Sequence, residues 1–132
     1  MANVTRSGAF SAPADEVWSV IGDFHALADW HPGVEKQTAE GDLRHLHVAG
    51  GGVIVERLLG EQTGETRSYA YEIVSGPLPV EGYRSVLAVA PAGSGSVVVW
   101  TSTFEPTAEA AFRLLAGIYE GGLKALAQKF PE

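Results

Sequence analysis

The amino-acid sequence predicts an α+β domain in which a curved antiparallel sheet of about seven strands packs around one long C-terminal helix. The first observation is the stretch from Thr107 to Phe130, where apolar residues recur at helical spacing before Pro131 ends the run. The second is a change to an apolar period of two from Val34 onward, in short segments joined by turns that favour antiparallel hairpins. The 132 residues suffice for one core, and we expect a single domain over residues 1–132.

The elements are expected in a simple order. Asn3–Phe10 alternates weakly and is predicted to be the first strand. Pro13 suits the first turn of a short helix, and a second short helical piece is expected over Ala26–Trp30. Thr107 is the predicted N-cap of the long helix. The six strands between them are predicted at Val34–Glu40, Leu43–Val48, Val53–Gly60, Arg67–Val74, Tyr83–Ala90 and Ser96–Phe104.

Two adjacent glycines, Gly121 and Gly122, interrupt the middle of the long helix. Each costs about 1 kcal/mol relative to alanine in a helix interior. The pair therefore indicates either a close backbone contact or space left beneath the helix. A cavity between helix and sheet is the interpretation with a functional consequence.

Composition excludes several classes of function. The net charge is −7 and no basic block occurs, which argues against binding to nucleic acid. Cysteine is absent, so disulfides and thiolate chemistry are excluded. No apolar run reaches the roughly 18–20 residues that cross a bilayer, and the N-terminus lacks the apolar core of a signal peptide. We therefore expect no membrane insertion and a cytoplasmic location.

Neither a metal nor a cofactor is predicted. His45 and His47 lie two apart on one strand and share a face, but no third ligand is placed by the sequence, so a solvated strand face is favoured. Gly50–Gly52 lacks the strand-to-helix setting and the lysine of a phosphate loop, and we interpret it as a flexible loop at a cavity mouth. Edge strands could pair, so the chain is expected to be a monomer or a homodimer.

The element order and several short strings resemble the START/Bet v 1-like (SRPBCC) superfamily, which includes the polyketide cyclase/dehydrase and lipid-transport group. The resemblance covers nearly the whole chain and implies the helix-grip fold with a hydrophobic small molecule in an internal cavity. Members of the group include hormone receptors, lipid carriers, cyclases and hydrolases, so the fold alone does not define the function. The strings are Ala12–Trp18, Ala28–Pro32, Glu56–Leu58, Tyr71–Ile73, Gly76–Pro79, Tyr83–Val86 and Gly121–Leu123.

Two of these strings are also similar to those of plant abscisic acid receptors, and this similarity nominates Glu56, Tyr83 and Ser85 as pocket residues. The chain departs from the receptors at both loops that gate their ligand, where it has Ala49–Gly52 and Pro77–Pro79. We therefore expect neither the partner-recruiting switch of those receptors nor their ligand.

Glu56 is the first candidate for chemistry. Alternation places Glu56 with Ile54 and Leu58 on one strand face, and pattern alone would turn the other face inward for its valines and leucine, the set Val53, Val55, Arg57 and Leu59. The resemblance turns Glu56 inward, where desolvation would raise its pKa and suit it to general acid–base catalysis. The alternative is a buried structural ion pair with Arg84 or Arg44.

The other catalytic candidates are His31, which could move a proton or merely form a structural corner, and Tyr83, which could donate to a developing oxyanion. Together with these residues, the resemblance implies a small cofactor-independent cyclase, dehydratase or related lyase acting on a polyketide-like or aromatic metabolite. The alternative is a carrier or sensor that performs no chemistry. The residues expected to contact the ligand, or else simply to fill the core, are Trp30, Tyr69, Tyr71, Ile73, Ser85, Leu87, Trp100, Ser102, Leu114, Ile118, Tyr119 and Gly122.

Overall fold

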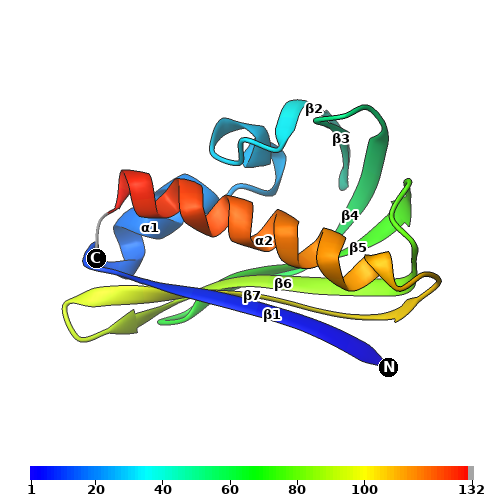
Figure 1. The fold of residues 1–132 in the computed structure, drawn as a ribbon. Helices are drawn as coiled ribbons and strands as arrows, with labels where there is room; N and C mark the ends of the chain where they lie inside the picture. The colour runs from blue at the N-terminus through cyan, green and yellow to red at the C-terminus, as the bar shows by residue number, and fades with distance from the viewer. Residues whose placement is uncertain (131–132) are drawn as a thin grey trace.

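The structure is a computed structural model that describes residues 1–130. Strand β1 is followed by helix α1, the 3-10 helix η1, six more strands and the long helix α2, as drawn in Figure 1. The predicted order is therefore confirmed. The bounds are β1 Ala2–Phe10, α1 Ala14–Ile21, η1 Phe24–Asp29, β2 Val34–Glu40, β3 Leu43–Val48, β4 Val53–Thr63, β5 Arg67–Ser75, β6 Val80–Ala92, β7 Gly95–Pro106 and α2 Ala110–Lys129.

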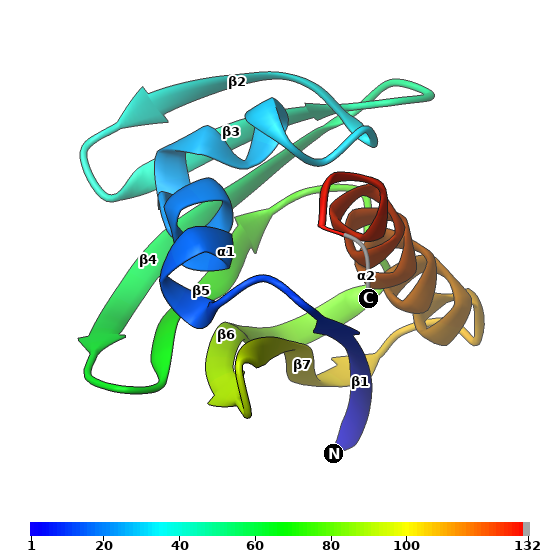
Figure 2. The ribbon, with the colours of Figure 1, turned by 90° about the vertical axis from the view of Figure 1, so that its left-hand side faces the viewer.

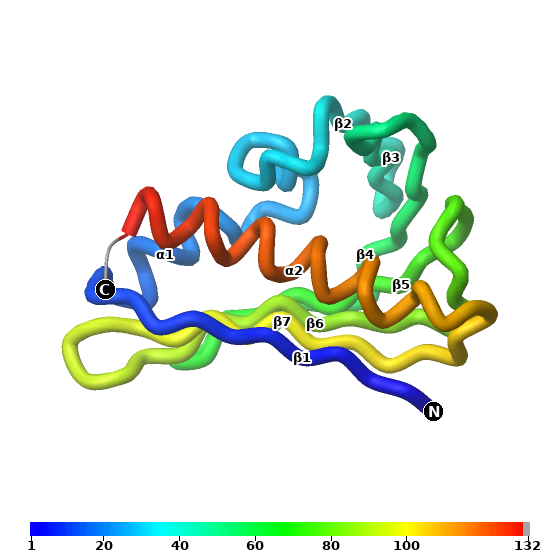
Figure 3. The backbone as a smooth tube through the Cα atoms, viewed as in Figure 1, coloured from blue at the N-terminus to red at the C-terminus, as the bar shows by residue number. Residues whose placement is uncertain are grey.

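All seven strands form one sheet in the order β1-β7-β6-β5-β4-β3-β2, and every neighbouring pair is antiparallel. Figure 2 shows the sheet curving around α2, with α1 and η1 packed beside the helix on the same concave side. The backbone trace in Figure 3 shows α2 running above β1, β7 and β6, with β2 and β3 on its other side. This arrangement is the predicted helix-grip fold.

Some predicted boundaries differ from the structure. Helix α2 begins at Ala110, and Glu109 is its N-cap residue without a side-chain capping bond, so the assignment of Thr107 as N-cap is wrong. The backbone N–H of Thr107 instead donates to the carbonyl of Pro79, 2.9 Å away, which ties the end of β7 to the start of β6. Pro131, the predicted helix stop, lies outside the described residues.

The alternation of each strand determines the core. On β4, Ile54 and Glu56 are buried while Val53 and Leu59 are exposed, so the face implied by the resemblance is the inward one. Tyr69 on β5, Leu87 on β6 and Trp100 on β7 are also buried, as predicted for the faces they share with their neighbours. On β3 the inward residues are Arg44 and Leu46, so His45 and His47 belong to the opposite face.

Helix α2 presents a narrower apolar face than its sequence indicates. Its buried residues are Ala111, Leu115, Tyr119, Gly122 and Leu126. Phe112 and Leu114 remain 43% and 41% exposed, respectively. Among residues 1–130, no helix has both the length and the apolar character needed to cross a bilayer.

Candidate functional site

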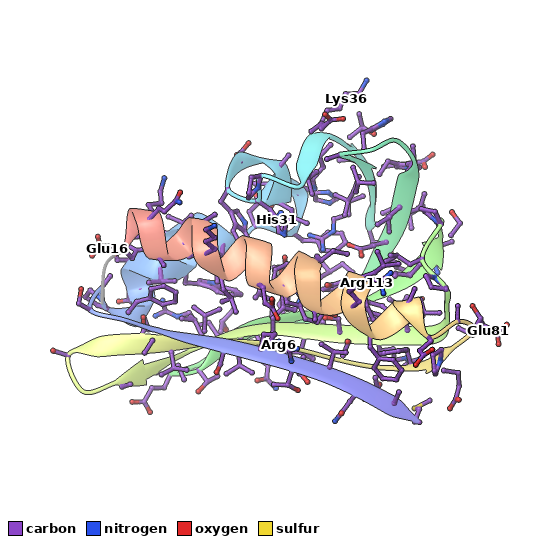
Figure 4. The ribbon with its side chains drawn as sticks, viewed as in Figure 1. Arg6, Glu16, His31, Lys36, Glu81 and Arg113 are labelled. Carbon is purple, nitrogen blue, oxygen red and sulfur yellow. The ribbon has the colours of Figure 1, made fainter. Side chains whose placement is uncertain are left out.

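A cavity of about 560 Å³ lies between α2 and the sheet. Most of its lining is apolar, with side chains from η1, β3, β4, β7 and α2 that include Leu27, Leu46, Ile54 and Leu115. The ionisable side chains in the lining are His31, Glu56, Tyr71, Tyr83 and Arg113. Figure 4 shows His31 above the middle of α2 and Arg113 on the N-terminal part of that helix.

Two loops meet beside this cavity. Gly50, Gly51 and Gly52 all have positive φ values, between 89° and 104°, which side chains rarely tolerate. A Cβ added at Gly52 would lie 3.3 Å from the Cγ atom of Pro77, so the glycine loop and the Pro77–Pro79 loop are in close contact. Ala49, Pro77 and Leu78 line the cavity, so the two loops border one side of it.

Glu56 lies opposite Arg44 in the β3–β4 register, and the two side chains form a buried ion pair. Arg44 Nε donates to Glu56 Oε1 at 2.8 Å, and Arg44 Nη2 lies 2.7 Å from the same oxygen. Burial raises the pKa of Glu56, and the charge of Arg44 opposes that rise. The structure therefore contains the buried pair that the sequence left as an alternative, with Arg44 rather than Arg84 as the partner.

Arg44 is itself enclosed by aromatic rings and is fully buried. Its Nη1 donates to the carbonyl of Phe24 at 2.8 Å and to the hydroxyl of Tyr69 at 3.2 Å. Its guanidinium lies 4.1 Å from the ring centre of Phe24 and 4.8 Å from that of Tyr71. Arg44 thus connects β3, η1 and β5 behind the cavity, a role that the sequence analysis did not assign to it.

A chain of hydroxyl groups forms the second polar feature. Trp100 Nε1 donates to the Tyr71 hydroxyl at 3.0 Å, and the Tyr71 and Tyr83 hydroxyl oxygens are 3.4 Å apart. The Tyr83 hydroxyl is also in close contact with that of Tyr119, whose ring stacks on Trp100. Burial raises the pKa of all three phenols, so they stay protonated at neutral pH and retain their protons as hydrogen-bond donors.

His31 is held by backbone groups at both ring nitrogens. The N–H of Gly33 donates to Nδ1 at 3.0 Å, so Nε2 carries the ring proton and donates to the carbonyl of Ile118 at 2.7 Å. Burial lowers the pKa of His31, which favours this neutral form. His31 therefore fastens the corner after η1 to α2, and neither nitrogen is free to exchange a proton with a ligand.

His31 predicts a specific pH dependence of stability. Its folded pKa lies below the value of 6.5 expected in the unfolded chain. Below that pH only the unfolded state takes up the proton, so His31 lowers the free energy of unfolding by up to about 1.4 kcal/mol per pH unit until the folded pKa is reached. Urea unfolding at pH values of about 7.5, 6.5 and 5.5 should show this slope in the wild type and its loss in His31→Asn. Parallel profiles for the two proteins would contradict the assignment.

The cavity brings together seven of the residues nominated from the sequence: His31, Glu56, Tyr71, Tyr83, Trp100, Leu114 and Ile118. The remaining nominees pack behind or beside the cavity and are not part of its lining: Trp30, Tyr69, Ile73, Ser85, Leu87, Ser102, Tyr119 and Gly122. Tyr69 illustrates the reason, because it packs against Trp18 of α1 and Phe24 of η1. The two short helices fill that end of the sheet, and this cavity lies beneath the part of α2 from Arg113 to Gly121.

The glycines of α2 differ in what lies next to them: Gly122 is in close contact with other side chains, and Gly117 and Gly121 border the cavity. A Cβ at Gly122 would lie 2.9 Å from Trp100, 3.0 Å from His31 and 3.1 Å from Trp30. Gly117 and Gly121 line the cavity instead, and a Cβ at Gly117 would meet no atom within 4 Å. Close contact therefore explains Gly122, while Gly117 and Gly121 border the open space.

Arg113 was not nominated from the sequence as a lining residue, since the i,i+4 spacing of Glu109 and Arg113 is typical of an ion pair on the solvated face of a helix. Glu120, which by the same spacing should face Lys124, instead pairs with Arg6 of β1 at 2.8 Å. The apolar lining residues Leu27 and Leu46 were also missed. No motif marks them, since their contribution depends on where α2 leaves a gap.

The chain is similar in sequence and structure to proteins of known fold. The structure of the protein XoxI from Bacillus cereus is 39% identical, with 98% of this chain and 96% of that chain covered and a TM-score of 0.93. A putative uncharacterized protein from Bacillus thuringiensis is 37% identical, with 99% and 100% covered and a TM-score of 0.92. The Zhui aromatase/cyclase from a Streptomyces species is 22% identical, with 97% and 92% covered and a TM-score of 0.76, a likeness of fold. No curated protein sequence matches the chain significantly.

A family model described as polyketide cyclase/dehydrase and lipid transport matches residues 1–131. The match takes in both the sheet and α2, the two elements that enclose the cavity. The fold, the cavity between helix and sheet and this match agree, and the chain belongs to the polyketide cyclase/dehydrase and lipid transport family.

Proposed function

We propose that this protein binds a flat hydrophobic metabolite, polyketide-like or aromatic, in the cavity beneath α2 and acts on it as a small cofactor-independent cyclase or dehydratase. The cavity volume of about 560 Å³ falls within the range of small-molecule sites, which are mostly apolar with a few convergent polar groups. The family of the chain and the aromatase/cyclase with the same fold support this class of ligand.

The observation that carries the proposal is the direction of the hydrogen bonds at the polar end of the cavity. An indole N–H can only donate, so the bond from Trp100 makes the Tyr71 oxygen an acceptor and leaves the Tyr71 proton to be donated onward. Its only neighbour among the cavity hydroxyls is Tyr83 at 3.4 Å, a long and weak contact. A ligand oxygen within hydrogen-bond distance of both phenols would accept the Tyr71 proton, and also the Tyr83 proton when the Tyr119 hydroxyl donates to Tyr83, so this end suits a carbonyl.

The same groups define a mechanism. Glu56 would remove a proton from the carbon beside a ligand carbonyl, and the electron pair would move onto the carbonyl oxygen, where Tyr71 and Tyr83 stabilise the resulting enolate. The enolate carbon would then attack a second carbonyl of the same folded ligand, forming a carbon–carbon bond and an alkoxide that takes the proton held by Glu56. Glu56 would next remove the second proton from the same carbon and pass it to the new hydroxyl, which leaves as water while the carbon–carbon double bond forms. The cavity contributes by holding the ligand folded.

A non-catalytic carrier or sensor is the second candidate, and the Glu56–Arg44 contact favours it. Two nitrogens of Arg44, Nε and Nη2, approach Oε1 of the carboxylate, and the charge of Arg44 opposes the rise in the pKa of Glu56 that burial causes. His31 offers no substitute base, since both of its nitrogens are engaged. The two candidates share the same ligand site and differ only in whether a product forms.

Binding through the phenols has a measurable consequence. We expect 2-acetylnaphthalene to bind about tenfold more tightly than 2-ethylnaphthalene, which lacks the carbonyl, because a hydrogen bond contributes roughly 0.5–1.5 kcal/mol. Tyr83→Phe and Tyr71→Phe should each weaken only the ketone, by about 3–10-fold. Quenching of tryptophan fluorescence, to which Trp100 in the lining contributes, provides the measurement.

Tyr69→Phe is the matched control, because the Tyr69 hydroxyl bonds to Arg44 and Tyr69 does not line the cavity. Equal affinity for both probes in the wild type would count against the donor site.

To separate enzyme from carrier, the protein is incubated with an aromatic 1,5-diketone, whose ring closure releases one water. Mass spectrometry should find the dehydrated product with wild type and less of it with Tyr83→Phe; binding without any product would support the carrier.

A further inference from the structure

We infer that the mouth of the cavity contains an anion-binding subsite centred on Arg113, and that the ligand is an organic acid whose carboxylate faces solvent. The inference rests on the proposed function, since it adds an outer contact to a ligand held in the same cavity. Arg113 lines the cavity from the N-terminal part of α2 (Figure 4). Arg113 is exposed and its neighbour Leu114, also in the lining, is 41% exposed, so this part of the lining meets water.

The formal charges of the lining leave Arg113 uncompensated. Glu56 is the other charged lining residue, and Arg44 behind it neutralises that carboxylate at 2.7 Å. His31 is neutral, as its two backbone contacts require. The cavity therefore carries one net positive charge in a chain whose net charge is −7. An anionic ligand would be repelled by the protein as a whole and attracted at this position.

Arg113 makes no hydrogen bond or ion pair within the part of the chain that the structure describes. Three other arginines are paired, Arg6 with Glu120, Arg57 with Glu72 and Arg67 with Asp15, whereas Arg84 on β6 has no ion pair among residues 1–130 and lies away from this cavity. Glu109, four residues before Arg113, is the N-cap residue, and no ion pair joins the two. The donors of the Arg113 guanidinium are thus available to a ligand.

The position of Arg113 argues against a role in helix stability. Helix α2 begins at Ala110, so Arg113 lies in the first turn, where the helix dipole disfavours a cation. The same dipole favours an anion near this end of the helix. The guanidinium of Arg113 can bind a carboxylate through two nitrogens.

The inferred ligand consequently has three parts. A carbonyl oxygen contacts Tyr71 and Tyr83, a flat apolar body fills the cavity, and a carboxylate reaches Arg113 at the mouth. The test uses 6-acetyl-2-naphthoic acid and its neutral amide, 6-acetyl-2-naphthamide, which differ only in the charge at the outer end. Dissociation constants of both are measured by fluorescence quenching with wild type, Arg113→Gln and Arg113→Lys.

Arg84→Gln is the matched control. Arg84 is exposed on β6, does not line this cavity, and makes no ion pair within residues 1–130, so the variant changes the net charge equally. We expect the acid to bind the wild type about 3–10-fold more tightly than the amide, the range for a charge-assisted contact near water. Arg113→Gln should abolish that preference and leave amide binding unchanged, while Arg113→Lys retains part of it. Added salt should weaken only the acid.

The following results would overturn the Arg113 subsite, alone or together with the proposed ligand class. Equal binding of acid and amide to the wild type, or an equal loss of acid binding in Arg84→Gln and Arg113→Gln, overturns the subsite. Amide binding that depends on Tyr83 would still uphold the proposed function in that case. Failure of both probes to bind the wild type overturns the subsite together with the ligand class on which it rests.

Discussion

Glu56→Gln is expected to lower the free energy of unfolding by about 3–5 kcal/mol, the usual cost of removing one partner of a buried ion pair. Arg44 is 0% exposed, and without the carboxylate its charge would keep only neutral partners among the described residues: the glutamine side-chain oxygen, the Phe24 carbonyl, the Tyr69 hydroxyl and ring faces. Arg44→Met should cost a similar amount, because Glu56 would be left buried without a cation. Urea unfolding followed by tryptophan fluorescence measures both changes.

The Arg44→Met variant should also respond to pH in a defined direction. Burial raises the pKa of Glu56 even beside Arg44, and loss of the guanidinium removes the opposing effect. A carboxyl whose folded pKa is raised stabilises the protein below its unfolded pKa, and this contribution is lost as the pH rises through the folded pKa. The destabilisation of Arg44→Met should therefore be larger at about pH 8 than at about pH 5.

A double-mutant cycle measures the interaction between Arg44 and Glu56 separately from the contacts that each makes with other groups. Arg44→Met combined with Glu56→Leu removes both charges, and we expect it to recover much of the stability lost in each single variant. The partly exposed pair Arg57–Glu72 is the control, where single changes should cost less than about 1 kcal/mol. Losses at Arg44 no larger than those at Arg57 would show that the buried pair does not stabilise the fold. A folded double variant would also allow the role of Glu56 in any reaction to be tested without the confounding loss of stability.

The sequence contained a signal for this pair that alternation alone does not provide. Pattern favoured burial of the valine and leucine face of β4, yet Val53 and Leu59 are 38% and 42% exposed. The β3–β4 connection is centred on the glycines after Ala49, and counting outward from such a hairpin places Arg44 opposite Glu56, as the register shows. Two opposite charges on one cross-strand pair would have argued for their shared face.

The extent of the cavity could not be predicted, because alternation determines a face and not a position along the strand. Tyr69 and Tyr71 share the inward face of β5, yet Tyr69 meets the side chains of α1 and η1 while Tyr71 lines the cavity. Which of them contacts the ligand depends on the packing of helices that are distant in the sequence. The sequence therefore allowed us to predict which side chains point inward. It did not allow us to predict which of them pack against the helices and which line the cavity.

The same limit applies to the glycines of α2, for which we predict opposite effects of one substitution. Gly122→Ala should lower the free energy of unfolding by about 1–3 kcal/mol, the usual cost of overpacking, although alanine favours the helix by about 1 kcal/mol. Gly117→Ala should raise it by up to about 1 kcal/mol, because its Cβ meets no atom within 4 Å. Gly121→Ala is intermediate in surroundings, with the His31 ring 3.6 Å away, and should not destabilise.

The strain that Gly122→Ala would introduce has no easy relief, because the aromatic rings around this position are held in place by other contacts. Trp100 stacks on Tyr119 with ring centres 4.7 Å apart and donates to Tyr71. His31 is bonded at both nitrogens, and its bond to the Ile118 carbonyl requires the ring to approach α2 where Gly122 has no side chain. Thermal and urea unfolding of the three alanine variants gives the comparison, and equal effects at Gly122 and Gly117 would contradict it. A shifted Trp100 would also move the Tyr71 hydroxyl, so Gly122→Ala should weaken 2-acetylnaphthalene binding more than 2-ethylnaphthalene binding, which links a helix contact to the donor site.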